Sequence, residues 1–248
     1  MLPEVLTVGR VSVDLYAQQE GASFLEPQTF MKSVGGSPTN VAVATARLGH
    51  RAAIVTKVGE GALGDYVRAQ LATWGVDTTY VGTGDGQTPV VLAALDPPED
   101  PQIVFYRGLA APDTQITTSD VPVEVIRECP VLWISFGALA QGTTADACQD
   151  WLDLRDRRAE VVLDLDYRPS MWPDRDAAHE VALAGNGDAY DALVDDYEPG
   201  MTGAAIAAMF DAMRPRLVAL REKVLGAEAP HGVVGTFGQD DQLALSRE

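Results

Sequence analysis

Residues 35–49 read GGSPTNVAVATARLG, and the rest of the chain is organised around this stretch. Gly35 and Gly36 free the backbone for positive φ angles or for close approach to a ligand. The alanine-rich run behind them predicts a helix that stops at Gly49. Three residues at its start are of types that cap helices: Ser37, Thr39 and Asn40. The glycine pair is therefore either an ordinary turn before a helix or a site that holds polar or anionic groups at a helix N-terminus.

Apolar strands and helices alternate on both sides of this stretch. Strands are predicted over residues 5–9, 11–16, 51–58, 131–137 and 161–166, and further helices over 66–74 and about 144–158. Residues 17–33 are predicted as a loop and 76–81 as a short extended segment. The alternation favours an α/β fold with a mostly parallel sheet and flanking helices.

One segment breaks the alternation. Residues 89–95 and 102–107 are apolar and rich in β-formers, and the turn residues Asp96–Pro101 lie between them. This pattern predicts a hairpin, which in an α/β protein often belongs to a lid or subdomain.

Charged side chains lie at or near the predicted strand ends. Asp14 follows the first strand, and Asp164, Asp166 and Arg168 lie at the end of the strand over 161–166. Ligands of open α/β sheets bind at the carboxyl ends of strands, so these residues are candidate site residues. Alternatively, Asp164 could cap a turn and Arg168 could be its surface partner.

The pattern changes after about residue 176. No further β-α-β unit is visible, and helices are predicted over 188–197 and from Thr202 onward, with a kink at Pro215. We therefore expect one α/β part over 1–176 and a helical tail of different origin over 177–248.

Composition limits the function classes. The formal net charge of −18 disfavours binding to nucleic acid or to anionic membranes. The two cysteines lack CxxC spacing and there are three histidines, so no metal site is predicted. Residues 59–64 have the spacing of a P-loop, but Asp65 stands where lysine is needed. The chain shows no signal peptide or membrane span, and we expect a cytoplasmic protein.

Four stretches together resemble the ribokinase-type (PfkB) carbohydrate kinases. They are residues 9–16 (GRVSVDLY), 35–49, the glycine-containing segments within 57–78, and 162–172 with DLDYRP. Three stretches are most similar in sequence to the 5-dehydro-2-deoxygluconokinases of inositol breakdown: residues 35–49, IVFYR and DLDYRP. The resemblance covers about residues 5–175 and implies a ribokinase-like fold with a small β-lid.

The resemblance also implies roles by position. Asp14 and Asn40 would bind sugar hydroxyls, and Gly35 and Gly36 would form the hinge of a lid that includes the 89–107 hairpin. Arg107 would lie near the acid group of the substrate. The phosphate side of the cleft would be lined by Asp164, Asp166 and Arg168. The implied reaction transfers the γ-phosphoryl group of ATP, with Mg²⁺, to a sugar or sugar acid, and the lid could form a homodimer.

The tail departs from this family. The second family signature, Asp-Thr-x-Gly-Ala-Gly-Asp, supplies the catalytic base and an anion hole, and it is absent from residues 176–248. No catalytic residue is therefore assigned. Residues of about 185–248 instead resemble an internal stretch of the M32-type carboxypeptidases, without their HExxH zinc helix. Two readings stay open, namely an impaired sugar kinase and an inactive sugar-binding remnant or fusion product; a peptidase-derived fragment is a weaker third. An α/β part that is incomplete on its C-terminal side should expose a sheet edge, so we expect aggregation or pairing with a partner.

Overall fold

The computed structural model describes residues 1–94, 96, 102–108, 110–155, 160–164, 166–168, 171–174, 176–178 and 181. The chain divides into two compact units, Met1–Val181 and Ala182–Glu248. All described residues belong to the first unit. The helices predicted over 188–197 and beyond Thr202 lie outside the described residues, and the origin of the tail stays a prediction.

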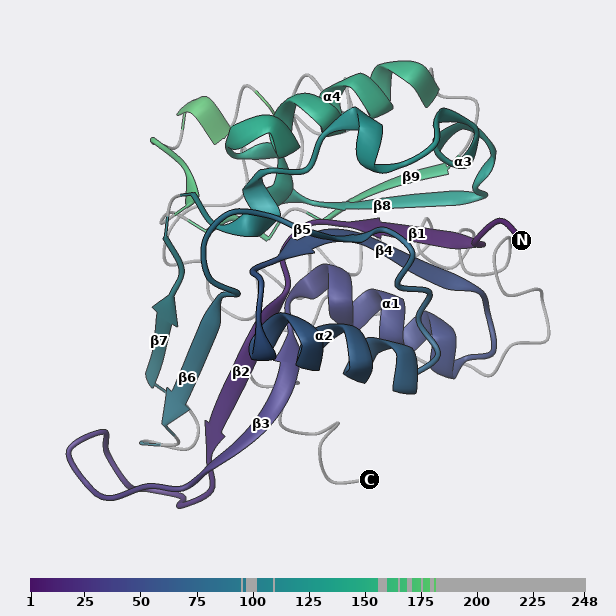
Figure 1. Cartoon of the computed structure of the whole chain (residues 1–248). Helices are drawn as coiled ribbons and strands as arrows, with labels where there is room; N and C mark the ends of the chain where they lie inside the picture. Colours follow the sequence, from purple (N-terminus) through teal and green to yellow (C-terminus); the bar gives the residue numbers. More distant parts are fainter. Residues whose placement is uncertain are drawn as a thin grey trace, which may run out of the picture. The chain divides into compact units, whose positions relative to one another are not determined.

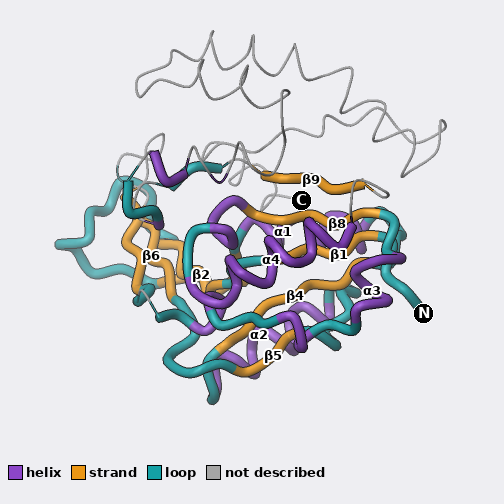
Figure 2. The backbone as a smooth tube through the Cα atoms, turned by 90° about the horizontal axis from the view of Figure 1, so that it is seen from above, coloured by secondary structure: helices purple, strands orange, loops and turns teal. Residues whose placement is uncertain are grey.

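A five-stranded parallel sheet forms the centre of the first unit (Figures 1 and 2). Its strands, in spatial order, are β5 (Val81–Thr83), β4 (Ala52–Val58), β1 (Val5–Val8), β8 (Val131–Ser135) and β9 (Glu160–Asp164). The strands β1, β4 and β8 are almost continuously apolar because both faces of the sheet are covered. The parallel α/β core predicted from the alternating pattern is confirmed.

Helices cover both faces of this sheet. Figure 1 shows α1 (Ser37–Arg47) and α2 (Ala62–Thr73) on one face, and α3 (Val123–Glu128) and α4 (Gly142–Arg155) on the other. Short 3₁₀ helices connect these elements: η1 (Pro112–Thr114), η2 (Thr118–Asp120) and η3 (Phe136–Leu139). Buried aliphatic side chains of α1, α2 and β4 form one core cluster, which includes Val43, Ile54, Val67 and Leu71. No helix of the described part is long and apolar enough to cross a membrane.

A second sheet projects from the first (Figure 1). Its spatial order is β3 (Phe30–Gly35), β2 (Ser12–Ala17), β6 (Val90–Ala94) and β7 (Gln102–Tyr106). The predicted hairpin is confirmed as the antiparallel pair of β6 and β7. The lid is larger than the hairpin, however, because β2 pairs with β6 in parallel and with β3 in antiparallel orientation. We call these four strands the lid sheet.

Three local predictions were wrong. Residues 30–33 are not loop but the start of β3, whose outer half is exposed and therefore lacks a continuous apolar pattern. The extended segment near 76–81 makes only a bridge at Asp77, and the strand β5 begins at Val81. The helix predicted over about 144–158 begins at Gly142 instead, and the hydroxyl of Thr144 inside it donates to the Asp113 carbonyl and accepts from the Ile116 amide.

The edge strand β9 is held by a buried arginine. The Arg155 side chain is 2% exposed, and its two terminal nitrogens donate to four backbone carbonyls. The acceptors are the carbonyl oxygens of Ile126, Cys129, Pro130 and Glu160. These bonds connect α3, α4 and β9, so they fix the strand that ends at Asp164.

Candidate functional site

The glycine pair makes the junction between the two sheets. Gly36 adopts φ 110° and is the N-cap of α1, with no side-chain cap. A Cβ atom on Gly36 would lie 2.3 Å from the Arg10 carbonyl oxygen, and one on Gly35 would lie 1.8 Å from Asp14 Oδ2. The capping predicted for Ser37, Thr39 and Asn40 was therefore wrong, because these residues lie inside the helix. The glycines are needed because backbone and carboxylate approach each other here.

We expect Gly36→Ala to lower the free energy of unfolding by roughly 2–4 kcal/mol, since it adds both backbone strain and a steric clash. Gly49→Ala is a matched control, because Gly49 also has positive φ (87°) but nothing lies within 4 Å of its added Cβ. Its cost should be only about 1 kcal/mol. Urea unfolding measures both, and equal losses would contradict the close-approach argument.

Asp14 lies in the middle of β2, in the lid sheet. The prediction that it follows a strand end was wrong, because β2 continues the chain directly from β1 after only three residues. Its carboxylate accepts hydrogen bonds from Ser12 Oγ (2.6 Å) and Tyr16 Oη (3.3 Å). Burial raises the pKa of Asp14, and these two hydrogen bonds and Arg10 oppose the rise. A half-buried, oriented carboxylate of this kind can accept hydrogen bonds from hydroxyl groups of a ligand.

The second group of predicted residues gathers at the end of β9. Asp164 is the last residue of that strand, and it receives a hydrogen bond from the side chain of Ser37 at the start of α1. Arg168 Nε donates to Asp166 Oδ2 at 2.8 Å. Burial, followed by the charge of Asp166, raises the pKa of Asp164. The strand-end interpretation of these three residues thus agrees with the structure.

Sequence reasoning missed Arg10, which follows β1. Arg10 lines one shallow hollow at the carboxyl ends of the strands, and eight other residues share it: Ser37, Ser135, Phe136, Gly137, Asp164, Asp166, Arg168 and Met171. Its guanidinium carbon lies 5.5 Å from the ring centre of Phe105 on β7. Arg10 also interacts electrostatically with Arg107, Asp113, Asp14 and Arg168. Asp14 and the group at the end of β9 therefore both interact with Arg10. The signal in the sequence was the position of Arg10, one residue after the glycine that ends a predicted strand.

Arg107 is not free. Its Nη2 donates to Asp113 Oδ2 on η1 at 2.5 Å, and the two side chains are 11% and 4% exposed. Asp113 was also missed, because a lone aspartate in a loop carries no recognisable pattern. The remaining predicted residue, Asn40, is exposed in the first turn of α1, and its side chain makes no hydrogen bond with a described residue.

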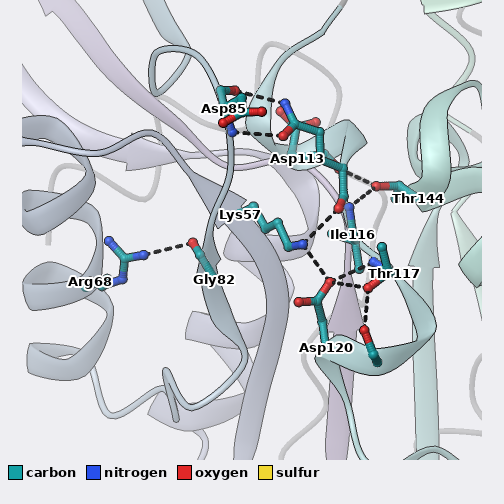
Figure 3. A network of polar contacts seen from close by, with 11 residues as sticks. Lys57, Arg68, Gly82, Asp85, Asp113, Ile116, Thr117, Asp120 and Thr144 are labelled. Atoms are coloured by element: carbon teal, nitrogen blue, oxygen red, sulfur yellow. Dashed lines mark hydrogen bonds and ion pairs between the residues drawn. The ribbon is translucent and has the colours of Figure 1, made fainter.

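A polar network anchors the segment that carries Asp113 (Figure 3). Lys57 on β4 donates to the Gln115 carbonyl at 2.8 Å and pairs with Asp120 at 2.7 Å. Asp120 in turn accepts from the Thr117 amide. These contacts fix the segment to the central sheet. The ion pair of Arg107 with Asp113 attaches the end of β7 in the lid sheet to the same segment.

A larger hollow of about 620 Å³ lies beside this network, at the ends of β4 and β5. Its lining consists of Lys57, Glu60, Gln115 and the loop Thr83–Gln87. The Lys57 ammonium is already engaged, and none of the predicted site residues lines this hollow. The predicted site residues therefore make the smaller hollow around Arg10 the better candidate site. Within the described residues, no group of three or more His, Cys, Asp or Glu side chains is placed to hold a metal ion.

Comparison with known proteins decides the family. The model of the pfkB family carbohydrate kinases matches residues 2–187. The chain belongs to this family. The 5-dehydro-2-deoxygluconokinase of Shouchella clausii is 29% identical over 265 residues, which cover 97% of this chain and 81% of that protein. The Geobacillus kaustophilus protein of the same name is 34% identical over 176 residues, covering 70% and 52%.

Solved structures show the same fold. An uncharacterized sugar kinase from Pyrococcus horikoshii, in complex with ATP, aligns with a TM-score of 0.64 and 22% identity. A fructokinase from Xylella fastidiosa aligns with a TM-score of 0.60 and 27% identity. The alignments cover 71% and 69% of this chain, but only 58% and 53% of those two chains.

A second family model also matches part of the chain. The model described as carboxypeptidase Taq (M32) metallopeptidase matches residues 139–248. It shares residues 139–187 with the pfkB match. The predicted resemblance of the tail to the M32 family is confirmed, and it begins earlier in the chain than residue 185.

Proposed function

We propose that the chain binds a sugar acid such as 5-dehydro-2-deoxygluconate and acts as an ATP-dependent kinase of impaired activity. One observation carries the proposal: Arg10 lines a hollow with Asp164, Asp166 and Arg168 at the strand ends of the central sheet, and it also interacts electrostatically with Asp14 on the lid sheet. The names of the relatives support the choice of a sugar acid. The keto-acid kinase of Thermotoga maritima, a 2-dehydro-3-deoxygluconokinase, shares the fold.

Each predicted residue takes a role in this proposal. Asp14 and Asn40 accept or donate hydrogen bonds to substrate hydroxyls, and the lid sheet closes at Gly35 and Gly36. Arg107 faces the acid group of the substrate. The phosphate groups lie toward a strand-end set: Asp164, Asp166 and Arg168.

The cofactors fit this strand end in chemical type. Arg168 offers a cation to phosphate oxygens, and the carboxylates of Asp164 and Asp166 are hard oxygen ligands of the kind that Mg²⁺ prefers. ATP with Mg²⁺ would supply the transferable phosphoryl group and neutralise its charge. Since ATP is a cytoplasmic substrate, the proposal places the protein in the cytoplasm.

Impairment follows from the sequence of the tail. Residues 176–248 lack the Asp-Thr-x-Gly-Ala-Gly-Asp stretch that supplies the base and the anion hole in this family. Without a base for the attacking hydroxyl, the transfer step loses roughly 10²–10⁴-fold in rate. An inactive sugar-binding protein is therefore the second candidate.

An ADP-release assay with 5-dehydro-2-deoxygluconate, run beside calorimetry of the same sugar acid, tests this proposal. Slow turnover that depends on both ATP and the sugar acid supports the kinase. Sugar binding without turnover supports the inactive protein. If the sugar acid neither binds nor reacts, both the kinase and the inactive sugar-binding protein are excluded.

The partial M32 match motivates a separate measurement. If the tail retained peptidase character, the purified protein would carry about one zinc per chain, as metallopeptidase sites do. We expect a zinc content near zero, since the HExxH spacing is absent. Stoichiometric zinc that a chelator removes with loss of a peptidase activity would overturn this expectation.

The lid sheet also supports a proposed homodimer. Five of its large apolar side chains are exposed: Phe30, Met31, Val104, Phe105 and Tyr106. Exposed apolar groups on a sheet favour association. Light scattering should find a dimer, and a monomer at micromolar concentration would contradict this assembly.

A further inference from the structure

Arg10 is the one guanidinium of the described hollow that has no counter-ion in contact. No carboxylate oxygen of a described residue lies within 4.0 Å of it. The two other arginines nearby are paired, Arg107 with Asp113 and Arg168 with Asp166. Arg10 is therefore the cation of this hollow that an incoming anion can pair with.

The electrostatics of Arg10 are unfavourable without a ligand. Burial and then the charge of Arg107 lower the pKa of Arg10, and the carboxylates of Asp113 and Asp14 only partly offset this. An arginine keeps its charge under such conditions, so its desolvation is only partly compensated. An anion in the hollow would relieve this cost.

The contact of Arg10 with Phe105 places Arg10 on the face of the lid sheet that carries Asp14. Asp14 pairs with Val91, and Val91 pairs with Phe105, so the three side chains form a row on one face. Arg10 stacks on Phe105 at the end of this row. A ligand whose hydroxyls reach Asp14 can therefore present a carboxylate to Arg10.

We propose that Arg10 is the specificity-determining residue for the carboxylate of the sugar acid, and that its stacking on Phe105 links this recognition to the lid sheet. This inference rests on the proposed function. Arg107 keeps its proposed place near the acid group, but Asp113 neutralises its charge, so Arg10 is the cation that distinguishes the acid from an uncharged ligand. A phosphate group is the other anion that could reach Arg10. The face shared with Asp14 favours the carboxylate, although Asp164 and Arg168 of the phosphate side line the same hollow as Arg10, so the test below includes ATP.

The test compares the binding of 5-dehydro-2-deoxygluconate with that of its uncharged methyl ester by calorimetry. The wild type should prefer the acid by about tenfold or more. In Arg10→Gln this preference should vanish while the affinity for the ester changes less than about twofold. Arg10→Lys should keep part of the preference, since it retains the charge but loses the bidentate geometry.

Arg47→Gln is the matched control, because Arg47 also lies over an aromatic ring, that of Trp74 at 5.9 Å, but on the exposed end of α1. It should leave the preference unchanged. Arg10→Lys keeps the charge and the fold. Its preference for the acid over the ester therefore tests the inference even if Arg10→Gln is poorly folded.

Four outcomes would overturn the inference. If Arg10→Gln or Arg10→Lys keeps the full preference for the acid, Arg10 does not recognise the carboxylate. If these variants lose affinity for ATP instead, Arg10 binds a phosphate. If the wild type binds acid and ester equally, the inference fails while the proposed function stands. If it binds neither, both fail.

Discussion

Replacing Asp14 by alanine is expected to reduce the affinity for the sugar acid at least about 100-fold. Hydrogen bonds from hydroxyls to an ionised carboxylate contribute about 1.5–3 kcal/mol each, and the carboxylate held by Ser12 and Tyr16 can accept two of them. Calorimetric titration of the sugar acid measures the loss. Retention of binding within tenfold would remove Asp14 from the proposed site.

Asp14→Asn separates the binding role from a structural one. Burial raises the pKa of Asp14 above its ordinary value of 3.8, so the native state holds this proton more tightly than the unfolded state. The contribution of Asp14 to stability is therefore full below pH 3.8 and is lost as pH rises through the folded pKa. At neutral pH the asparagine variant should melt higher than the wild type and still bind the sugar acid poorly. A lower Tm together with weaker binding would indicate a structural role.

The second large effect concerns the buried ion pair between the lid sheet and η1. Asp113→Ala leaves the guanidinium of Arg107, 11% exposed, without its partner. Removing one member of a buried pair costs about 3–5 kcal/mol. For a chain of this size that corresponds to a decrease in Tm of roughly 10 °C.

The chain provides a matched control for this measurement. Asp166→Ala removes the partner of Arg168, but those two side chains are 43% and 41% exposed, so the cost should stay below about 1 kcal/mol. A double variant, Arg107→Met with Asp113→Leu, should recover most of the stability, because no unpaired charge remains buried. If Asp113→Ala melts within 2 °C of Asp166→Ala, roughly half a kcal/mol apart, the pair contributes little to the attachment of the lid sheet.

The sequence predicted the elements whose local residue pattern matches their burial and pairing in the folded protein. Strands β1, β4 and β8 are apolar on both faces, so their pattern is strong. The hairpin β6–β7 was visible because turn residues separate two β-rich runs. Strand β3 was missed because its outer residues Phe30–Lys32 are exposed, and its pairing with β2 is set by contacts that a local pattern does not encode.

The site residues fall into the same two groups: those that a local sequence pattern reveals and those that depend on contacts formed on folding. Asp164, Asp166 and Arg168 were placed correctly because the end of a parallel strand is a position that the sequence reveals. Asp14 was predicted as a site residue that follows the first strand, whereas the pairing of β2 with β6 places it in the lid sheet. Arg10 and Asp113 were missed because their importance arises from which charges lack or possess a partner after folding. For Arg10 those relations join residues about 100 positions apart, whereas Asp113 pairs with Arg107 only six positions away.

The attachment of the lid sheet has a mechanical consequence. The chain crosses between the two sheets four times, at residues 9–11, at Gly36, at 84–89 and at 107–111. If the lid sheet closes over a ligand as proposed, these four connections limit the directions in which it can move. A ligand would then remove little orientational freedom from the lid sheet on closure.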